Sequence, residues 1–213
     1  MSTVPPVLSA PIWTPVALSS DLPAATAIPG VCDGVDLAIW RGASGRVAVW
    51  RDRCPHRGMR LSHGFVRGDM LSCIYHGWRF DGASQCRKIP AHPDLEPPAA
   101  IRATAIAGVE AHGVIWAALE APEVAPPDLG PVVPLRSLRF AAPLEVVAEL
   151  AGITGVTARL SGLPLTMLLQ RLPDGGCAAH CLLPEAEPAL RLTASRALED
   201  LRRRAEAKEE IAA

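Results

Sequence analysis

Two short segments of the sequence each place a cysteine close to a histidine. Cys54 and His56 lie in "RCPHRGMRL", and Cys73 and His76 lie in "LSCIYHGWRF". Two thiolates and two neutral imidazoles can hold one zinc ion, or one 2Fe–2S cluster in which histidines replace two of the cysteines. The two segments therefore predict a metal centre, and the residue types alone leave both kinds open.

The distribution of these ligands between the segments favours the cluster. Structural zinc sites usually begin with two cysteines separated by about two to four residues, whereas here each segment supplies one cysteine and one histidine. In the mixed-ligand cluster, one iron takes a cysteine from each loop and the other takes a histidine from each loop. Gly58 and Gly77 lack a Cβ atom, so we expect their backbone to approach the sulfides and point N–H groups at them.

Short β signals surround and position both segments. Two alternating apolar runs, residues 35–42 and 45–52, predict a hairpin whose second strand leads directly into the first loop. A further apolar run that starts at Asp69 leads into the second loop. Residues 100–120 predict another pair of strands, which we expect to break at Gly108. This region should therefore be a turn-rich, all-β unit with its reactive residues on loops.

A proline-rich stretch divides the chain. Residues 121–134 contain five prolines, and proline fixes φ and cannot donate to a β ladder, so we expect a semi-rigid linker there. Residues 1–11 are expected to be an N-terminal tail, and residues 12–120 to form the all-β unit, a small antiparallel sandwich. Residues 135–213 should form a small α+β unit.

The second unit is predicted to contain a hairpin and a closing helix. The turn residues "PDGG" are flanked by residues 165–172 and 177–184, which predicts the hairpin. The sequence from about Thr193 onward contains no glycine or proline and predicts the helix. Three apolar residues should form the buried stripe of this helix: Leu198, Leu201 and Ala205. Two acidic and basic pairs four positions apart should stabilise its exposed side: Glu199 with Arg203, and Asp200 with Arg204.

The bulk composition excludes several classes of function. A formal charge of −1 and a pI near 6.6 provide no electrostatic footprint for nucleic acid or an anionic membrane. No secretory signal and no apolar run of about 20 residues is visible, so we expect a soluble, cytoplasmic protein. In such a compartment, Cys177 and Cys181 are expected to be packing residues rather than a disulfide.

The remaining histidines do not form a second metal site in the sequence. Four are left after the two candidate ligands: His63, His92, His112 and His180. The first two fall in polar loops and should be exposed, the third lies at a strand turn, and the fourth lies in an apolar strand. Glu110 near His112 is too small a set for a metal site. We therefore interpret all four as structural.

The two loops and their surroundings closely resemble a known family. "WRDRCPHRGMRLSHG" and "LSCIYHGWRFDGASQCRKIPA" are similar to the N-terminal Rieske domain of ring-hydroxylating and demethylating non-haem-iron oxygenases. The likeness extends from about Ile12 to Leu119 and includes "WTPVALSSDLP" and "AHGVIWAAL". The Rieske subunits of cytochrome complexes fit worse, because Met59 and Tyr75 stand where those proteins carry a pair of disulfide-forming cysteines.

The resemblance implies a Rieske-type 2Fe–2S cofactor and a role for each ligand. Cys54 and Cys73 would bind the iron that stays ferric, and His56 and His76 would bind the iron that accepts the electron, at a solvent-facing edge. Full oxygenase subunits of the family also carry a mononuclear iron held by two histidines and a carboxylate, a set that we do not find here.

The leading hypothesis is therefore an electron-transfer or accessory component of an oxygenase system. It would take electrons from a reductase or ferredoxin and pass them to an oxygenase subunit with the catalytic iron. One alternative is a catalytic oxygenase whose mononuclear site is completed by another chain, and another is a redox-sensing or structural 2Fe–2S protein. The sequence leaves the substrate, the redox partners and the oligomeric state open.

Overall fold

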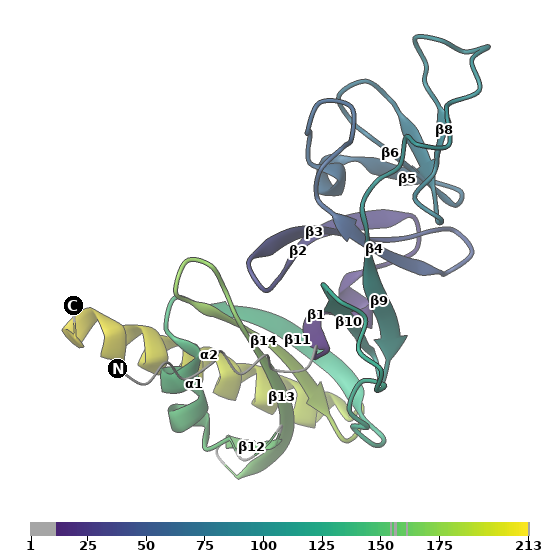
Figure 1. Ribbon diagram of the computed structural model, residues 1–213. Coiled ribbons are helices and arrows are strands. Elements are labelled where there is room, and N and C mark those ends of the chain that lie inside the picture. The colour runs from purple at the N-terminus through teal and green to yellow at the C-terminus, as the bar shows by residue number, and fades with distance from the viewer. Residues whose placement is uncertain (1–11, 154, 156, 161, 213) are drawn as a thin grey trace.

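The computed structural model describes residues 12–153, 155, 157–160 and 162–212 (Figure 1). The expected tail, residues 1–11, lies outside the described residues. Figure 1 shows an elongated arrangement in which the strands of residues 26–88 occupy the upper part, and the strands after residue 132 and both helices occupy the lower part. The strands at residues 14–18 and 105–118 lie where the two parts meet. We call residues 12–118 the N-terminal unit and residues 133–212 the C-terminal unit.

A six-stranded antiparallel sheet is the larger layer of the N-terminal unit. Its strands run in the order β1-β10-β9-β4-β3-β2. Their bounds are β1 Thr14–Leu18, β2 Thr26–Cys32, β3 Val35–Arg41, β4 Val47–Arg51, β9 Ala105–Ala111 and β10 Val114–Ala118. The 3-10 turn η1 (Ser19–Asp21) follows β1. The expected hairpin is confirmed, because β3 and β4 pair from Leu37 opposite Arg51 to Arg41 opposite Val47.

A smaller four-stranded sheet is the second layer and lies next to the candidate ligands. Its order is β5-β6-β7-β8. Its strands are β5 Phe65–Arg67, β6 Met70–Ser72, β7 Arg79–Asp81 and β8 Cys86–Lys88, preceded by the 3-10 turn η2 (Leu61–His63). The first candidate loop lies between β4 and η2, and the second joins β6 to β7. Both loops are therefore anchored at each end by ordered backbone.

The two sheets enclose a core that contains both candidate cysteines. Trp40 and Trp50 from the larger sheet meet Phe80 from the smaller one, and all three are almost fully buried. Trp50 lies edge-on to both, with ring centroids 5.0 Å from Trp40 and 6.3 Å from Phe80. Such edge contacts suit the quadrupoles of aromatic rings. Cys54 and Cys73 belong to the same core, so its packing supports the candidate site.

The last hairpin of the N-terminal unit turns at a different place from the one we expected. β9 continues through Gly108, which pairs with Ala117 of β10, so the predicted break is wrong. A Cβ atom on Gly108 would lie 2.5 Å from Val49 Cγ2, so glycine serves close packing there rather than a turn. The turn lies at His112 and Gly113, whose φ angles of 53° and 73° suit a tight hairpin.

The C-terminal unit is a four-stranded antiparallel sheet with two helices. The sheet order is β11-β14-β13-β12. The bounds are β11 Val133–Phe140, α1 Leu144–Ala151, β12 Thr157–Leu160, β13 Leu163–Arg171, β14 Cys177–Leu183 and α2 Pro188–Ala212. The predicted β13–β14 hairpin is confirmed. β11 begins inside the stretch expected to be a linker, and the division of the chain into domains stays a prediction.

Helix α2 covers one face of this sheet. It begins at Pro188, earlier than the predicted start at Thr193. The predicted stripe is confirmed, because Leu198, Leu201 and Ala205 are at most 1% exposed and pack in one core with alternate residues of β14. Cys177 and Cys181 point into that core as free thiols, so their interpretation as packing residues is also confirmed.

The ion pairs on α2 differ from those expected. Glu199 contacts Arg202 at 3.0 Å and Arg136 of β11 at 2.9 Å, while Asp200 lies 3.5 Å from Arg203. The predicted pairs four positions apart are therefore wrong. Arg136 explains the change for Glu199, since it offers a second cation on the side of the sheet.

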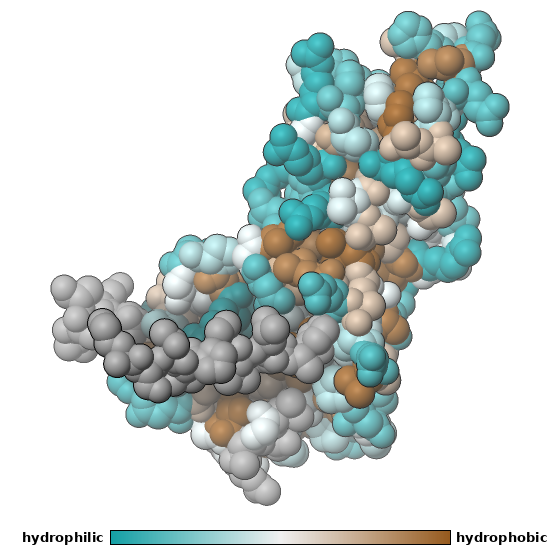
Figure 2. Space-filling model, viewed as in Figure 1, coloured by the Kyte–Doolittle hydropathy of each residue, from teal (hydrophilic) through white to brown (hydrophobic). Residues whose placement is uncertain are grey.

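The two units contact each other through side chains. An apolar cluster joins Leu18, Val114 and Trp116 of the N-terminal unit to Leu168 and Leu182 of the C-terminal unit. In Figure 2, hydrophobic residues, coloured brown, also gather where the upper and lower parts of the molecule meet. The Trp13 indole N–H donates to Val124 O at 2.7 Å, which ties the first described residues to the connecting segment.

Candidate metal centre

The two candidate loops, residues 54–59 and 73–78, have the same backbone geometry. In each, the cysteine N–H donates to the carbonyl five residues later, and the glycine N–H donates to the cysteine carbonyl, over 2.8 to 3.0 Å. Gly58 and Gly77 adopt φ angles of 73° and 70°, which only glycine adopts at little cost. The loops are therefore a matched pair, although His56 and His76 occupy different positions within them.

This geometry corrects the expected role of the two glycines. Their N–H groups donate to the cysteine carbonyls, and the positive φ angle is what requires glycine at both positions. At Gly77 there is also little room, because a Cβ atom would lie 3.0 Å from Pro90 Cγ. The backbone N–H groups that point at a candidate ligand are instead those of His56 and Arg57, which face the Cys54 thiol.

Burial divides the four candidate ligands into two kinds. Cys54 and Cys73 are 3% and 2% exposed, and their thiols lie next to each other. His56 and His76 are exposed, and their ring centroids are 4.7 Å apart. The site therefore has a buried sulfur side and a solvent-facing imidazole side, as the resemblance implies.

The proton affinities of the site follow from this asymmetry. Burial, with a smaller contribution from the Cys73 thiol, raises the pKa of Cys54 to about 11, against the lowering effect of the His56 and Arg57 amides. Desolvation and then the charges of His76 and Arg57 lower the pKa of His56. Metal ligands must be a deprotonated thiol and a neutral imidazole. The histidine is thus prepared for binding, while the buried thiol needs a metal to lose its proton.

Two aromatic residues that the sequence reasoning gave no role contact the imidazoles. The Trp78 ring stacks on His56 with centroids 4.3 Å apart and planes within 6° of parallel. The centroids of the Tyr75 and His76 rings are 3.8 Å apart, and Tyr75 is 55% exposed. Both residues lie within the second quoted segment, so the sequence could have indicated that they are near the site. The stacking of Trp78 on a histidine of the other loop could not be predicted from the sequence.

A buried carboxylate anchors the first loop and was also missed. Asp52 accepts hydrogen bonds from the Ser62 N–H at 2.7 Å and from the Ser62 hydroxyl at 2.6 Å. Arg60 lies 3.8 Å from the same carboxylate and 2.6 Å from Asp36. These contacts join the two ends of the loop and fix its span, because Asp52 precedes the ligands and Ser62 follows them.

The four other histidines lie away from the candidate ligands. His63 and His92 are exposed, as expected. His112 lies 3.5 Å from Asp128, whereas Glu110 forms a bidentate pair with Arg41 over 2.8 and 2.9 Å. Glu110 and His112 therefore face different partners. The hydrogen bond from Arg41 is the main cause that lowers the pKa of Glu110.

His180 is the buried histidine, on the face of β14 that meets the N-terminal unit. Its Nδ1 lies 2.9 Å from the Ser137 hydroxyl, which in turn donates to Asp21 at 2.5 Å. Burial lowers its pKa to about 4, so the ring is neutral at neutral pH. The contacts connect the two units and agree with a structural interpretation.

Comparison with known families decides the nature of the centre. Residues 12–101 match the family model described as "Rieske [2Fe-2S] domain". These residues form a Rieske [2Fe-2S] domain. The cofactor of such a domain is a Rieske-type 2Fe–2S cluster, so the zinc alternative falls away. The donor set fits this cofactor, since adjacent buried thiols and paired exposed imidazoles can serve two different irons. The assignment of the four ligands by number stays a proposal.

Characterised relatives contain similar Rieske sequences. Oxidoreductase NdmD of Pseudomonas putida is 43% identical over 111 residues, which are 52% of this chain and 19% of that protein. The oxygenase subunit of 3-chlorobenzoate-3,4-dioxygenase of Comamonas testosteroni is 34% identical over 116 residues, 54% of this chain and 27% of that protein. The alignments thus span less than a third of either relative.

The fold resembles solved oxygenase structures beyond the Rieske domain. Apo dicamba monooxygenase has a TM-score of 0.72 and 21% identity, with 93% of this chain and 86% of that chain covered. This likeness concerns the fold alone. The expected fold class, an all-β Rieske domain followed by a small α+β unit, is confirmed. Among the described residues, neither helix is long and apolar enough to span a membrane.

Proposed function

We propose that this chain transfers single electrons within an oxygenase system, through a Rieske cluster held by Cys54, His56, Cys73 and His76. The cluster, when bound, accepts and releases one electron at a time. The observation that carries the proposal is the asymmetry of the site, with both cysteines buried and both histidines exposed. Electron transfer between proteins needs one edge of the cluster to be exposed, so that a partner can approach it closely, and the rest of the cluster to be shielded from water. The exposed histidines would provide the edge, and the buried cysteines would provide the shielding.

The protein's own residues have three tasks in this proposal. The thiols of Cys54 and Cys73 hold one side of the cofactor inside the apolar core, away from water. His56 and His76 present their rings to a partner, and the contacts with Trp78 and Tyr75 limit their rotation. Asp52 and Ser62 keep the first loop at a fixed span. Rigid ligands need little rearrangement when the charge changes, which favours fast transfer.

The exposed edge indicates the kind of partner. Ile74 and Tyr75 are 57% and 55% exposed beside His76. Arg57 is close enough to His56 to lower its pKa, and the Arg53 guanidinium lies against Gly58. An apolar patch bordered by two cations suits an acidic surface. We therefore propose an acidic reductase or ferredoxin as the electron donor and an oxygenase subunit as the acceptor.

Small charged oxidants test this function. Reduced holoprotein would be mixed rapidly with ferricyanide or with tris(1,10-phenanthroline)cobalt(III), and the return of the oxidised absorption followed. We expect the rate with anionic ferricyanide to fall as ionic strength rises. The double variant Arg53→Gln and Arg57→Gln should lower that rate about three- to ten-fold at low salt and raise the rate with the cobalt complex.

The control for this experiment removes the same charge elsewhere. Arg196 and Arg204 are exposed on α2, and the double variant Arg196→Gln and Arg204→Gln should leave both rates unchanged within about two-fold. Equal effects of the two double variants would contradict a basic entry edge. If the cluster exchanged electrons only slowly with every oxidant and reductant, the result would contradict the electron-transfer function and favour a sensing or structural role.

The catalytic oxygenase remains the second candidate because of one observation. The fold likeness to dicamba monooxygenase covers 93% of this chain, so it includes the C-terminal unit as well as the Rieske domain. Iron analysis distinguishes the two functions. The electron-transfer proposal expects about two irons per chain, whereas a stoichiometric third iron would favour the oxygenase.

A further inference from the structure

A pocket of about 380 Å³ lies at the base of the first loop of the Rieske domain. Arg51 and Arg53 line it from the end of β4, Arg60 lines it from the segment after the loop, and Gly58 of the loop forms part of its wall. None of the four proposed cluster ligands lines it. Its volume is at the lower end of the range for small-molecule sites. The pocket is therefore next to the proposed metal centre without being part of it.

The local backbone directs Arg51 and Arg53 to the same side of the chain. The Arg53 N–H donates to Arg51 O at 2.7 Å, which closes a three-residue turn around Asp52. The residues on either side of this turn are exposed, while Asp52 is buried. The Asp52 N–H also donates to Asp36 O at 2.9 Å, which fixes the turn to β3. Two cationic side chains therefore point outward from one short turn and line one pocket.

These two arginines have no carboxylate partner. Neither guanidinium forms an ion pair within 4.0 Å among the residues that the structure describes. The Arg53 guanidinium lies against Gly58, since a Cβ atom at that glycine would be 3.3 Å from Arg53 Cζ. Exposed guanidiniums without a partner keep their N–H donors available for an anion.

The two carboxylates of the pocket are already engaged. The Asp52 side chain is 0% exposed, and its two oxygens accept from the N–H and the hydroxyl of Ser62. Asp36 accepts from Arg60 at 2.6 Å. Three arginines against two aspartates give the lining a net positive charge, and that charge resides on the two unpaired arginines. The lining therefore favours an anion.

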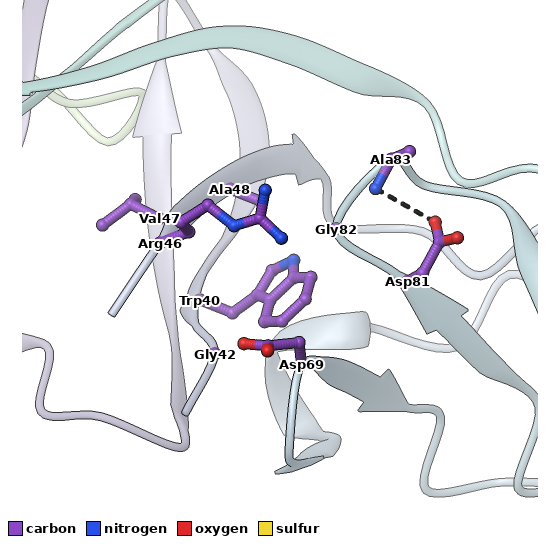
Figure 3. Close-up of a pocket in the computed structure, with 9 residues that line it drawn as sticks. All are labelled: Trp40, Gly42, Arg46, Val47, Ala48, Asp69, Asp81, Gly82 and Ala83. Atoms are coloured by element: carbon purple, nitrogen blue, oxygen red, sulfur yellow. Dashed lines mark hydrogen bonds between the residues drawn. The ribbon is translucent and has the colours of Figure 1, made fainter. Parts of the chain in front are cut away.

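A second pocket of the same domain has the opposite charge balance (Figure 3). Among the described residues, its lining contains one arginine, Arg46, and two aspartates, Asp69 and Asp81. Arg46 is close enough to Asp69 for their charges to interact. A net negative lining disfavours an anion. The pocket in Figure 3 is therefore the internal comparison for the pocket at Arg51.

We propose that the pocket at Arg51 binds a phosphate dianion, either free or as the end group of a small phosphorylated molecule. Two negative charges would neutralise the two unpaired guanidiniums of Arg51 and Arg53. Phosphate offers acceptor oxygens in several directions, whereas a carboxylate offers two oxygens in one plane and suits a single guanidinium.

A bound phosphate would also change the exposed edge of the metal centre. Arg53 is one of the two cations that border this edge, so a dianion on Arg53 would weaken the attraction of the edge for an anionic partner. This consequence rests on the proposed electron-transfer function, whereas the binding itself does not.

Phosphorus NMR of inorganic phosphate, added to the oxidised holoprotein at constant ionic strength, tests the binding. We expect a saturable broadening of the phosphate signal with half-saturation at about 1–10 mM. Arg51→Gln should raise the half-saturation concentration about ten-fold, because it removes a charged hydrogen-bond donor. Asp36→Asn should lower it about three-fold, because it releases Arg60 for the ligand.

Phenyl phosphate in the same titration distinguishes the two sources of the phosphate group. Binding at least as tight as that of inorganic phosphate would support a phosphorylated molecule as the ligand, and weaker binding would support free phosphate.

The control variant is Arg46→Gln, which removes an exposed arginine from the pocket in Figure 3 and should leave phosphate binding unchanged. Arg51 and Arg46 are both exposed, so neither substitution disturbs the core. Absence of saturation, equal weakening by Arg51→Gln and Arg46→Gln, or reversal of the broadening by an equal concentration of acetate would each overturn the proposal.

Oxidation of the reduced holoprotein by ferricyanide tests the consequence for electron transfer. Saturating phosphate should slow this reaction about three-fold more than sodium chloride at the same ionic strength, and Arg51→Gln should remove the difference. Phosphate that binds without this additional slowing would overturn the effect on the exposed edge. Slow electron exchange in both salts would count against the proposed function, while the binding measured by NMR would stand.

Discussion

Replacing Cys73 with alanine is expected to remove the iron and the visible absorption of the protein, whereas replacing Cys86 leaves both in place. Both side chains are free thiols in the same core and are 2% and 1% exposed. Only Cys73 lies beside the Cys54 thiol at the turn of a candidate loop. The Cys86 thiol is directed to Lys88 O, 3.8 Å away. Position in the loop, and not burial, should therefore decide the outcome.

The measurement for this pair is the content of iron and acid-labile sulfide, together with the visible spectrum, after identical purification. Cys73→Ala should lose at least about nine-tenths of each, because one iron would lack a thiolate. Cys86→Ala removes only a small buried group and should cost about 1 kcal/mol of stability. Retention of iron by Cys73→Ala, or equal losses in both variants, would contradict the proposed ligand set.

Replacing Trp50 with alanine is expected to be the most destabilising single change in the Rieske core. The side chain is 1% exposed and holds edge contacts to both Trp40 and Phe80. Truncating a buried tryptophan removes its transfer free energy and leaves a cavity, so we expect a loss of about 3–5 kcal/mol. Because Cys54 and Cys73 share this core, the variant should also release its cluster at lower denaturant concentration.

Urea unfolding of the holoproteins, followed by both tryptophan fluorescence and visible absorption, measures this effect. Tyr75→Ala is the matched control, since it also removes an aromatic ring but from a side chain that is 55% exposed. Its unfolding free energy should change by no more than about 0.5 kcal/mol. A similar loss in both variants would show that the three-ring core does not govern the stability of the domain.

The candidate site was readable from the sequence because its information is local. Cys54, His56 and Gly58 lie within five consecutive residues, and the second loop has the same three residue types within five, with the histidine one position later. Residue type and spacing alone therefore indicated the chemistry. The hairpin before the first loop was equally predictable, because apolar residues alternate along both of its strands. By contrast, the stacking of Trp78 on His56 joins two loops, and a pattern along the chain carries no signal for it.

The wrong prediction at Gly108 and the missed helix α1 also have physical causes. Gly108 was expected to be a turn because glycine breaks strands, but its role depends on Val49 of a neighbouring strand. Helix α1 was missed although Pro143 precedes it and Gly152, with φ of 61°, ends it, which is a typical pair of boundary signals. It is short and flanked by proline and glycine, so its stability comes from packing against α2 and the sheet rather than from propensity.

Pulsed electron paramagnetic resonance of the reduced protein, labelled with nitrogen-15 histidine, tests the central claim most directly. The claim is that His56 and His76 bind the same iron of a 2Fe–2S cluster whose other iron binds Cys54 and Cys73. We predict about two irons and about two sulfides per chain, with couplings from two histidine nitrogens that change with the label. A zinc-bound protein, or a reduced cluster without histidine couplings, would contradict the account.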